Sequence, residues 1–151
     1  MTVETRFSDG VLTVRKEFAK PIDVVFDAWI DAAKTTHWWG CADTTQVVSE
    51  IETKAGGKYC HTMTITNVGD HTINGSLVEF DPPRKLVYSM PASEFAPAML
   101  VSVAFGETAT GTVVTLTQSE IPDPMKDVIG AGWTASFNRL DAYFQGQRRA
   151  A

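Results

Sequence analysis

The chain has 151 residues, of which 44% are hydrophobic and 21% charged, a composition typical of one ordinary globular domain. Its formal net charge of −5 argues against a nucleic-acid partner, because such a partner normally requires a basic face. No apolar run approaches the ~20 residues that span a bilayer, and no leader is visible. We therefore expect a cytoplasmic protein without a membrane partner, whose two cysteines are free thiols. Residues 1–151 carry no repeat or linker and are predicted to form a single domain.

The first predicted element is a strand over residues 11–18, where apolar and charged side chains alternate. Pro21 then begins a helix whose apolar positions recur at helical spacing as far as Ile30. Asp31 is placed to cap a second, short helix that ends near Trp39. Two short helices are therefore predicted after the first strand.

The middle of the chain is predicted to consist of strands. Turn-like stretches rich in glycine, proline, asparagine and aspartate separate them, and such short connections imply antiparallel pairing. The predicted strands cover residues 46–53, 58–66, 72–80, 85–90, 99–106 and 112–118. With the first strand, they predict one antiparallel sheet of six to seven strands.

The last predicted element is a long helix that begins after Asp123, an N-cap candidate followed by proline. Its apolar stripe runs over residues 125–144, and Gly146 is placed to end it. Gly130 and Gly132 lie inside this helix, where each costs ~1 kcal/mol relative to alanine. They suggest that another backbone packs closely there, or that space is left for something to enter.

These elements predict an α+β fold in which a curved antiparallel sheet wraps around the long C-terminal helix. A curled sheet that grips one helix rarely closes perfectly on it. We therefore expect an apolar cavity between the sheet and the helix, opening near the two short helices.

Several motifs follow one another along nearly the whole chain. They are the segment FAKPIDVVFDAWID at 18–31, Trp38-Trp39, Gly56-Gly57-x-Tyr59, Gly75, Asp81-Pro82-Pro83-Arg84-x-Leu86, Thr112-x-Val114-x-Leu116-Thr117, and Gly132-Trp133 with Phe137 and Leu140. In this order they resemble the helix-grip fold of the START-like superfamily, also called SRPBCC. Within it, the chain resembles a single-domain member of the family named for activator of heat-shock protein 90 ATPase homologue 1.

Two departures limit what this resemblance implies. Cys41 stands where relatives often carry proline, so the loop after the tryptophan pair is expected to differ in shape. Eukaryotic co-chaperones of this name carry an additional N-terminal chaperone-binding domain, for which 151 residues leave no room. The resemblance therefore implies the fold, whereas co-chaperone activity does not follow from it.

The predicted cavity is expected to be lined by aromatic and flexible apolar side chains. Within strand 58–66, Tyr59, His61 and Met63 share the inward face, where His61 is either a hydrogen-bonded core residue or a ligand contact. Trp29 belongs to the buried stripe of its helix and is interpreted as core. The candidate ligand-binding residues are Trp38, Trp39, Tyr59, His61, Met63, Tyr88, Met90, Met99, Val101, Trp133 and Phe137.

The adjacent pair Trp38 and Trp39 would point about 100° apart on a helix, so both cannot be buried in one core face. One is expected to pack against the edge of the sheet. The other is predicted to form the lip of the cavity, with a partner contact or plain packing as the alternatives.

Chemistry-bearing motifs are not found. The spacing of His37 and Cys41 matches no metal-binding signature, and Cys60 and His61 would point to opposite faces of one strand. There is also no nucleophile elbow of the G-x-S-x-G type. We therefore expect no catalytic residue, no metal and no cofactor.

Three functions fit this sequence. The first is binding of a small apolar or aromatic ligand in the cavity. The second is that of an interaction protein that stimulates the ATPase of heat-shock protein 90, so that a chaperone is the partner. The third is a cyclase-like or hydrolase-like enzyme that uses polar groups of the inner face, namely Tyr59, His61 and Tyr88. Both a monomer and a homodimer are compatible with the sequence.

Overall fold

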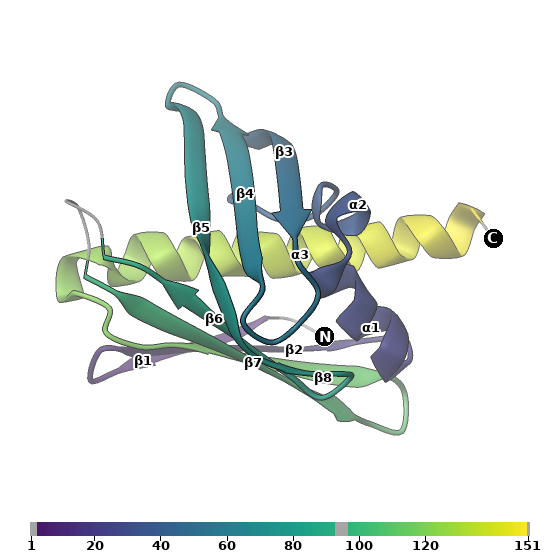
Figure 1. Ribbon diagram of the computed structural model, residues 1–151. Coiled ribbons are helices and arrows are strands. Elements are labelled where there is room, and N and C mark those ends of the chain that lie inside the picture. The colour runs from purple at the N-terminus through teal and green to yellow at the C-terminus, as the bar shows by residue number, and fades with distance from the viewer. Residues whose placement is uncertain (1–2, 93–96, 151) are drawn as a thin grey trace.

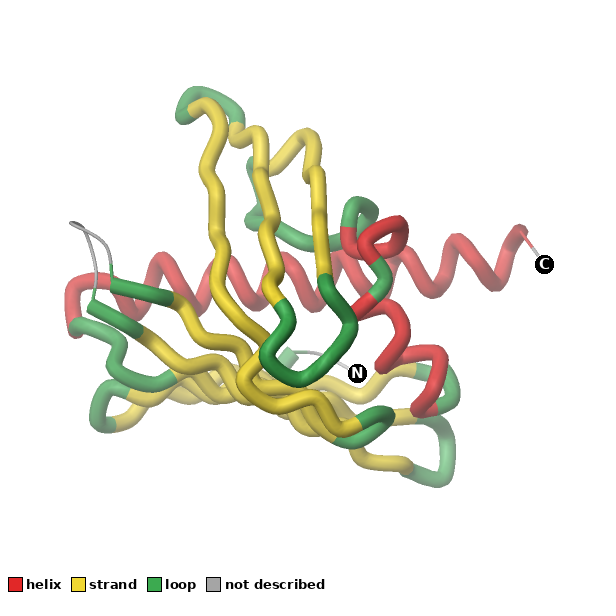
Figure 2. The backbone as a smooth tube through the Cα atoms, in the orientation of Figure 1, coloured by secondary structure: helices red, strands yellow, loops and turns green. Residues whose placement is uncertain are grey.

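The computed structural model describes residues 3–92 and 97–150, with side chains as far as residue 146. Its strands are β1 (Glu4–Ser8), β2 (Val11–Phe18), β3 (Thr44–Ile51), β4 (Lys58–Ile65), β5 (Gly69–Asp81), β6 (Lys85–Met90), β7 (Met99–Glu107) and β8 (Thr112–Gln118). Its helices are α1 (Ile22–Ile30), α2 (Ala32–Thr35), the 3-10 turn η1 (Asp123–Met125) and α3 (Lys126–Ala150). Figure 2 shows the strands together with the long helix that runs across them and the two short helices at one side, which confirms the predicted α+β fold.

The strands form one antiparallel sheet in the order β1-β2-β8-β7-β6-β5-β4-β3. Its two halves meet in the long strand β5, where the register with β6 shifts between Leu77 and Glu79. Such an irregularity bends a strand, and Figure 1 shows β3 and β4 standing up from the rest of the sheet. The helix α3 lies in the resulting curve, so the helix-grip arrangement predicted from the sequence is confirmed.

The sheet has eight strands because β1, which the sequence analysis missed, adds an edge strand to β2. Most of its residues are exposed, so the alternation that marks a half-buried strand is weak there. The connecting residues Asp9 and Gly10 both have positive φ, 51° and 78°, as a two-residue hairpin turn requires. This Asp-Gly pair is the sequence signal that would have predicted the hairpin.

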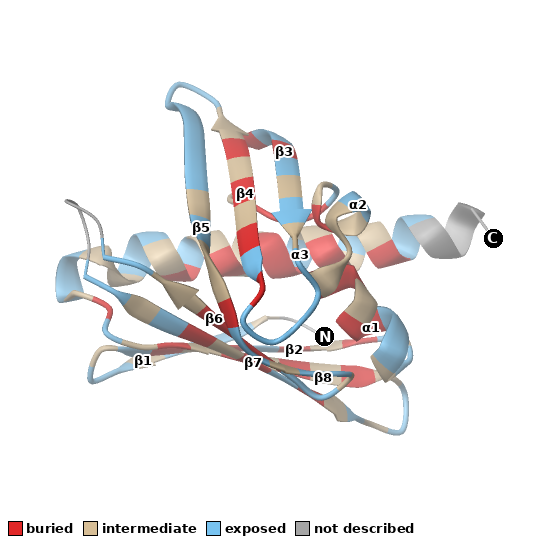
Figure 3. Ribbon diagram, viewed as in Figure 1, coloured by how far each residue is buried: buried red, intermediate tan, exposed pale blue. Residues whose placement is uncertain are grey.

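The apolar stripe of α3 is confirmed. Trp133, Phe137, Leu140 and Phe144 are buried, and α3 packs most closely on β2 and β1. Figure 3 shows these buried positions recurring along α3 and on the strands that it faces. None of the helices in the described residues has the length and hydrophobicity that crossing a membrane requires.

The predicted ends of the long helix are wrong. Asp123 does not cap it but lies in the 3-10 turn η1, which precedes α3. The helix continues through Gly146 to Ala150, because a glycine ends a helix by adopting positive φ, which Gly146 does not do.

Close packing of another backbone against the helix glycines is also not found. A Cβ added to Gly130 would meet only side chains of Leu12 and Thr5, at 3.8 and 3.9 Å, and one added to Gly132 would meet nothing within 4 Å. Both glycines therefore stand in ordinary or open surroundings, and neither is required by the packing of α3.

The structure corrects the prediction for the tryptophan pair, because Trp38 and Trp39 are both buried. The helix α2 ends at Thr35, so the pair lies in the turn that follows and not on one helical face. Trp38 packs on Trp29, with ring centroids 4.7 Å apart, and Trp39 turns the other way, towards β4 and α3. The lip of a cavity, predicted at this pair, is therefore not formed by either indole.

The loop after this pair is held against α3. The Ser136 hydroxyl donates to the Gly40 carbonyl (2.6 Å), and the Gly40 amide donates back to the same hydroxyl (3.1 Å). The Arg139 guanidinium donates to the carbonyls of Cys41 and Thr44, at 2.9 and 3.0 Å. These four hydrogen bonds fix the segment that places Trp39 inside the molecule.

We predict that Trp133→Ala and Trp39→Ala each lower the free energy of unfolding by ~3–5 kcal/mol, the usual range for removing a core indole. Urea denaturation of both variants measures this loss. Val128→Ala on the exposed side of α3 is the control and should change stability by less than about 0.5 kcal/mol. If Trp39→Ala lost as little stability as the control, the result would contradict the burial of Trp39 in the core.

Candidate functional site

The candidate ligand-binding residues all belong to the interior between the sheet and α3. Buried among them are Trp38, Trp39, Tyr59, His61, Met63, Tyr88, Val101, Trp133 and Phe137. Met90 and Met99 are partly buried and face each other at the end of the β6–β7 pair. The structure therefore brings together residues that five different segments of the sequence supply.

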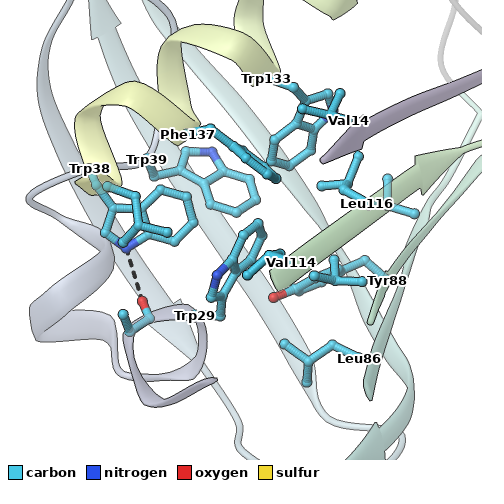
Figure 4. Close-up of a cluster of buried hydrophobic side chains, with 14 of the residues drawn as sticks. Val14, Trp29, Trp38, Trp39, Leu86, Tyr88, Val114, Leu116, Trp133 and Phe137 are labelled. Atoms are coloured by element: carbon cyan, nitrogen blue, oxygen red, sulfur yellow. Dashed lines mark hydrogen bonds between the residues drawn. The ribbon is translucent and has the colours of Figure 1, made fainter. Parts of the chain in front are cut away.

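Trp39 stands at the centre of this interior. Its ring stacks on His61 of β4, with centroids 3.9 Å apart and planes inclined by 21°. It meets Trp133 of α3 edge to face at 5.3 Å and Tyr88 of β6 at 6.5 Å. We call the rings of Trp29, Trp38, Trp39, Tyr59, His61, Tyr88 and Trp133 the aromatic cluster, most of which Figure 4 shows.

Besides Nδ1 of His61, which is described below, three polar atoms of the aromatic cluster have partners in the protein. The indole nitrogens of Trp38 and Trp133 donate to the Ala28 carbonyl (2.9 Å) and to Oε1 of Gln118 (2.7 Å). The Tyr59 hydroxyl donates to the Ser89 carbonyl at 2.9 Å. Sequence reasoning missed Gln118, although a polar residue on the inward face of an otherwise apolar strand was the available signal.

Three other polar atoms of the aromatic cluster are buried without a hydrogen-bond partner. They are Nε1 of Trp29, Nε2 of His61 and the hydroxyl of Tyr88, on residues that are at most 2% exposed. Figure 4 shows the Tyr88 hydroxyl pointing into the middle of the cluster. Buried polar groups are nearly always paired, and each one left unpaired costs ~1–3 kcal/mol. Three such atoms in one interior therefore call for a functional explanation.

Two hydroxyl groups connect His61 to the short helix α2. Ser49 lies opposite His61 in the β3–β4 pair, and its Oγ is 2.8 Å from Nδ1 of the imidazole. The buried Thr35 donates from Oγ1 to Ser49 Oγ at 2.7 Å. Neither residue could be found from the sequence, since their contact depends on the strand register and on where α2 ends.

Burial sets the protonation states of the aromatic cluster. Desolvation lowers the pKa of His61 from 6.5 to about 3, so the imidazole is neutral at physiological pH. Desolvation likewise raises the pKa of Tyr59 and, with a smaller contribution from the Tyr59 charge, that of Tyr88. Both phenols therefore keep their protons and can act as hydrogen-bond donors.

Two hollows mark the surface of the described residues. One of about 360 Å³ lies beside the two short helices and is lined by Asp27, Ile30, Asp31, Ala32, Ile51 and Thr53. The other, of about 710 Å³, lies over β3, β4 and β5 and is lined by Glu50, Ile51, Glu52, Lys58, Tyr59, Cys60, Asn74, Gly75, Ser76 and Pro91. Neither lies between the sheet and α3. Residues of the aromatic cluster are packed in that space, and neither hollow is the open cavity predicted there.

The residues weighed as metal ligands lie apart. His37 is exposed and stacks on Tyr143 of α3, with centroids 5.2 Å apart, while Cys41 and Cys60 are free thiols. Cys60 and His61 point to opposite faces of β4. In the part of the chain that the structure describes, no three His, Cys, Asp or Glu side chains converge as metal ligands would.

Two matched variants test whether the Tyr88 hydroxyl is unpaired. Tyr59→Phe loses a hydrogen bond and should lower the free energy of unfolding by about 1 kcal/mol, whereas Tyr88→Phe should raise it by a similar amount. Urea denaturation of the ligand-free protein measures both changes. Destabilisation by Tyr88→Phe would show that this hydroxyl has a partner.

The lowered pKa of His61 predicts a pH dependence of stability. Below pH 6.5 the unfolded chain binds a proton at this imidazole, but the folded protein does not until about pH 3. The free energy of unfolding is therefore highest with respect to this group above pH 6.5 and decreases as the pH is lowered. Between pH 7 and 5 this decrease is about 2 kcal/mol. Denaturation at both pH values should show this extra loss relative to His61→Gln, and equal losses would contradict the prediction.

Comparisons with known proteins agree with this architecture. The chain superposes on protein NE0264 from Nitrosomonas europaea with a TM-score of 0.82 and 16% identity, covering 97% of this chain and all of that one. An AHSA1-like protein from Aeromonas hydrophila gives a TM-score of 0.74 at 21% identity, with 91% and 93% of the chains covered. CalU16 from Micromonospora echinospora gives 0.69 at 18% identity, with 99% and 87% covered.

At these identities the solved structures show a shared fold, and no curated protein matches the sequence. The model of the family described as activator of Hsp90 ATPase homolog 1-like protein matches residues 19–145, which is most of the chain. With the helix-grip architecture, this match shows that the chain belongs to the activator of Hsp90 ATPase homolog 1-like family of the START-like, or SRPBCC, superfamily.

Proposed function

We propose that this protein binds a small, largely apolar or aromatic molecule within the aromatic cluster between the sheet and α3. The observation that carries the proposal is the set of three buried polar atoms without partners, on Trp29, His61 and Tyr88. A bound molecule with complementary polar groups would supply these partners and recover the free energy that their burial costs. The remaining rings of the cluster would supply the apolar contacts.

Trp39 is the ring whose displacement would make room for such a molecule. It is carried by a loop and not by a strand or helix, and it touches β4, β6 and α3 at once. The backbone of α3 approaches β2 and β1 most closely, so Trp39 fills the wider space towards β4. Movement of this indole would uncover His61, Tyr88 and Trp133 together, and a ligand ring would take its place.

Stimulation of a chaperone ATPase is the alternative that the family description suggests. It requires an exposed contact surface, whereas large apolar residues such as Val48, Val68 and Val128 are scattered singly over the described surface. We therefore place it second. An ATPase assay with the host's heat-shock protein 90 tests it, and an unchanged rate at saturating protein would reject it.

An enzyme is the third alternative, favoured by the contact between the Ser49 hydroxyl and the His61 imidazole. If His61 acts in turnover, His61→Phe should abolish the reaction while binding persists. Equal turnover in that variant would remove His61 from any mechanism.

Thermal and urea unfolding in the presence of a panel of fused-ring aromatic compounds tests the binding proposal. A compound present at a hundred times its Kd should stabilise the protein by about 2.7 kcal/mol. Trp39→Ala tests where the ligand binds. Added indole should bind in the space left by the side chain and restore part of the lost stability. Val128→Ala with indole is the control. The proposal fails if no compound of the panel stabilises the unmodified chain.

A further inference from the structure

Two of the three residues with an unpartnered polar atom, His61 and Tyr88, adjoin the position of the Trp39 ring. Trp39 contacts His61 and Tyr88 directly, and it reaches Trp29 through Trp38, which lies 5.6 Å from Trp39 and 4.7 Å from Trp29. A molecule that takes the place of the Trp39 ring would therefore lie against His61 and Tyr88, with Trp29 one ring further away. Their hydrogen-bonding character decides what that molecule can be.

Two of the three atoms are donors by their chemistry. An indole Nε1–H only donates, so Trp29 can be satisfied only by an acceptor. The Tyr88 hydroxyl keeps its proton, which likewise needs an acceptor. The third atom, Nε2 of His61, is a donor or an acceptor according to the tautomer of the neutral imidazole.

The hydroxyl pair Thr35–Ser49 fixes that tautomer. Thr35 has one proton, and its distance of 2.7 Å to Ser49 Oγ is a normal hydrogen bond, whereas the Ala32 carbonyl is 3.2 Å away. Ser49 Oγ therefore accepts from Thr35, and Nδ1 of His61, 2.8 Å away, is the acceptor that its own proton has among its contacts in the described residues. Since a neutral imidazole carries one proton, that proton is on Nε2, the atom that faces the interior.

A charged acceptor does not suit this place. Among the buried side chains that the structure describes, Lys16 is the one with a positive charge, and it pairs with Asp141 at 3.9 Å. It contacts the ring of Phe18, which is not part of the aromatic cluster. A carboxylate beside Trp39 would therefore lose its hydration without gaining a cation, which is strongly unfavourable.

We propose that the ligand is a neutral ring compound with a carbonyl acceptor, such as a ketone, quinone or cyclic amide, which accepts hydrogen bonds from His61 and Tyr88. Ser49 and Thr35 are the positioning residues that hold the His61 donor in its tautomer. This inference rests on the proposed function, because it specifies the ligand class of the same interior.

The tautomer is tested on the protein alone. Long-range ¹H–¹⁵N correlation spectra of the imidazole should show a protonated Nε2 and an unprotonated Nδ1 at His61. In Ser49→Ala the Nδ1–H tautomer should become populated, and Ser49→Thr should restore the original one. The control is Thr62→Ala, which breaks the exposed hydrogen bond between the Thr62 and Thr72 hydroxyls, and it should leave the spectrum unchanged. A protonated Nδ1 in the unmodified chain would overturn the inference.

The ligand class is tested with two probes of nearly equal shape, 1-indanone and indane, in binding titrations. One gained hydrogen bond should make the Kd of indanone about tenfold lower than that of indane. Tyr88→Phe should reduce this ratio, while Thr62→Ala keeps it. Equal affinity for the two probes would overturn the acceptor preference but leave the proposed function standing. Binding of neither probe would count against both.

Discussion

The contact of Trp39 with His61 on one side and Trp133 on the other connects the two halves of this molecule. In Figure 1 the strands β3, β4 and β5 rise from the rest of the sheet, and the Trp39 indole lies between His61 of β4 and Trp133 of α3. Its position in turn depends on the hydrogen bonds between Gly40 and Ser136. Because those bonds join a loop to a helix, the filling of the interior depends on a segment with no regular structure of its own.

Most of the fold could be predicted from the sequence because it depends on local periodicity. Strand β2 and the buried face of β4 follow from alternation, and the stripe of α3 follows from helical spacing. The burial of Trp38 and Trp39 could not be predicted, since it depends on α2 ending at Thr35 and not near Trp39. A difference of one helical turn therefore decided whether these indoles are surface or core.

The candidate site shows the same division. Sequence alternation correctly placed Tyr59 and His61 on the inward face, but the contact of Ser49 with His61 depends on the register between β3 and β4. Whether a buried polar atom has a partner depends on distances of a few tenths of an ångström, which no sequence pattern encodes. The chemistry of the site, in contrast to its location, therefore needed the structure.

The family and the solved structures fix the shape of this protein, yet one shape hosts many functions. At 16–21% identity the likeness to the neighbours is one of fold and leaves the chemistry of the interior unspecified. A fully apolar interior would be the more stable solution, since each unpaired polar atom costs ~1–3 kcal/mol of folding free energy. A chain that keeps three of them inside a packed aromatic cluster gives up stability there. The cluster is therefore better explained by the ligand binding proposed above than by folding, and under that proposal its donors, more than the fold, decide which ligand fits.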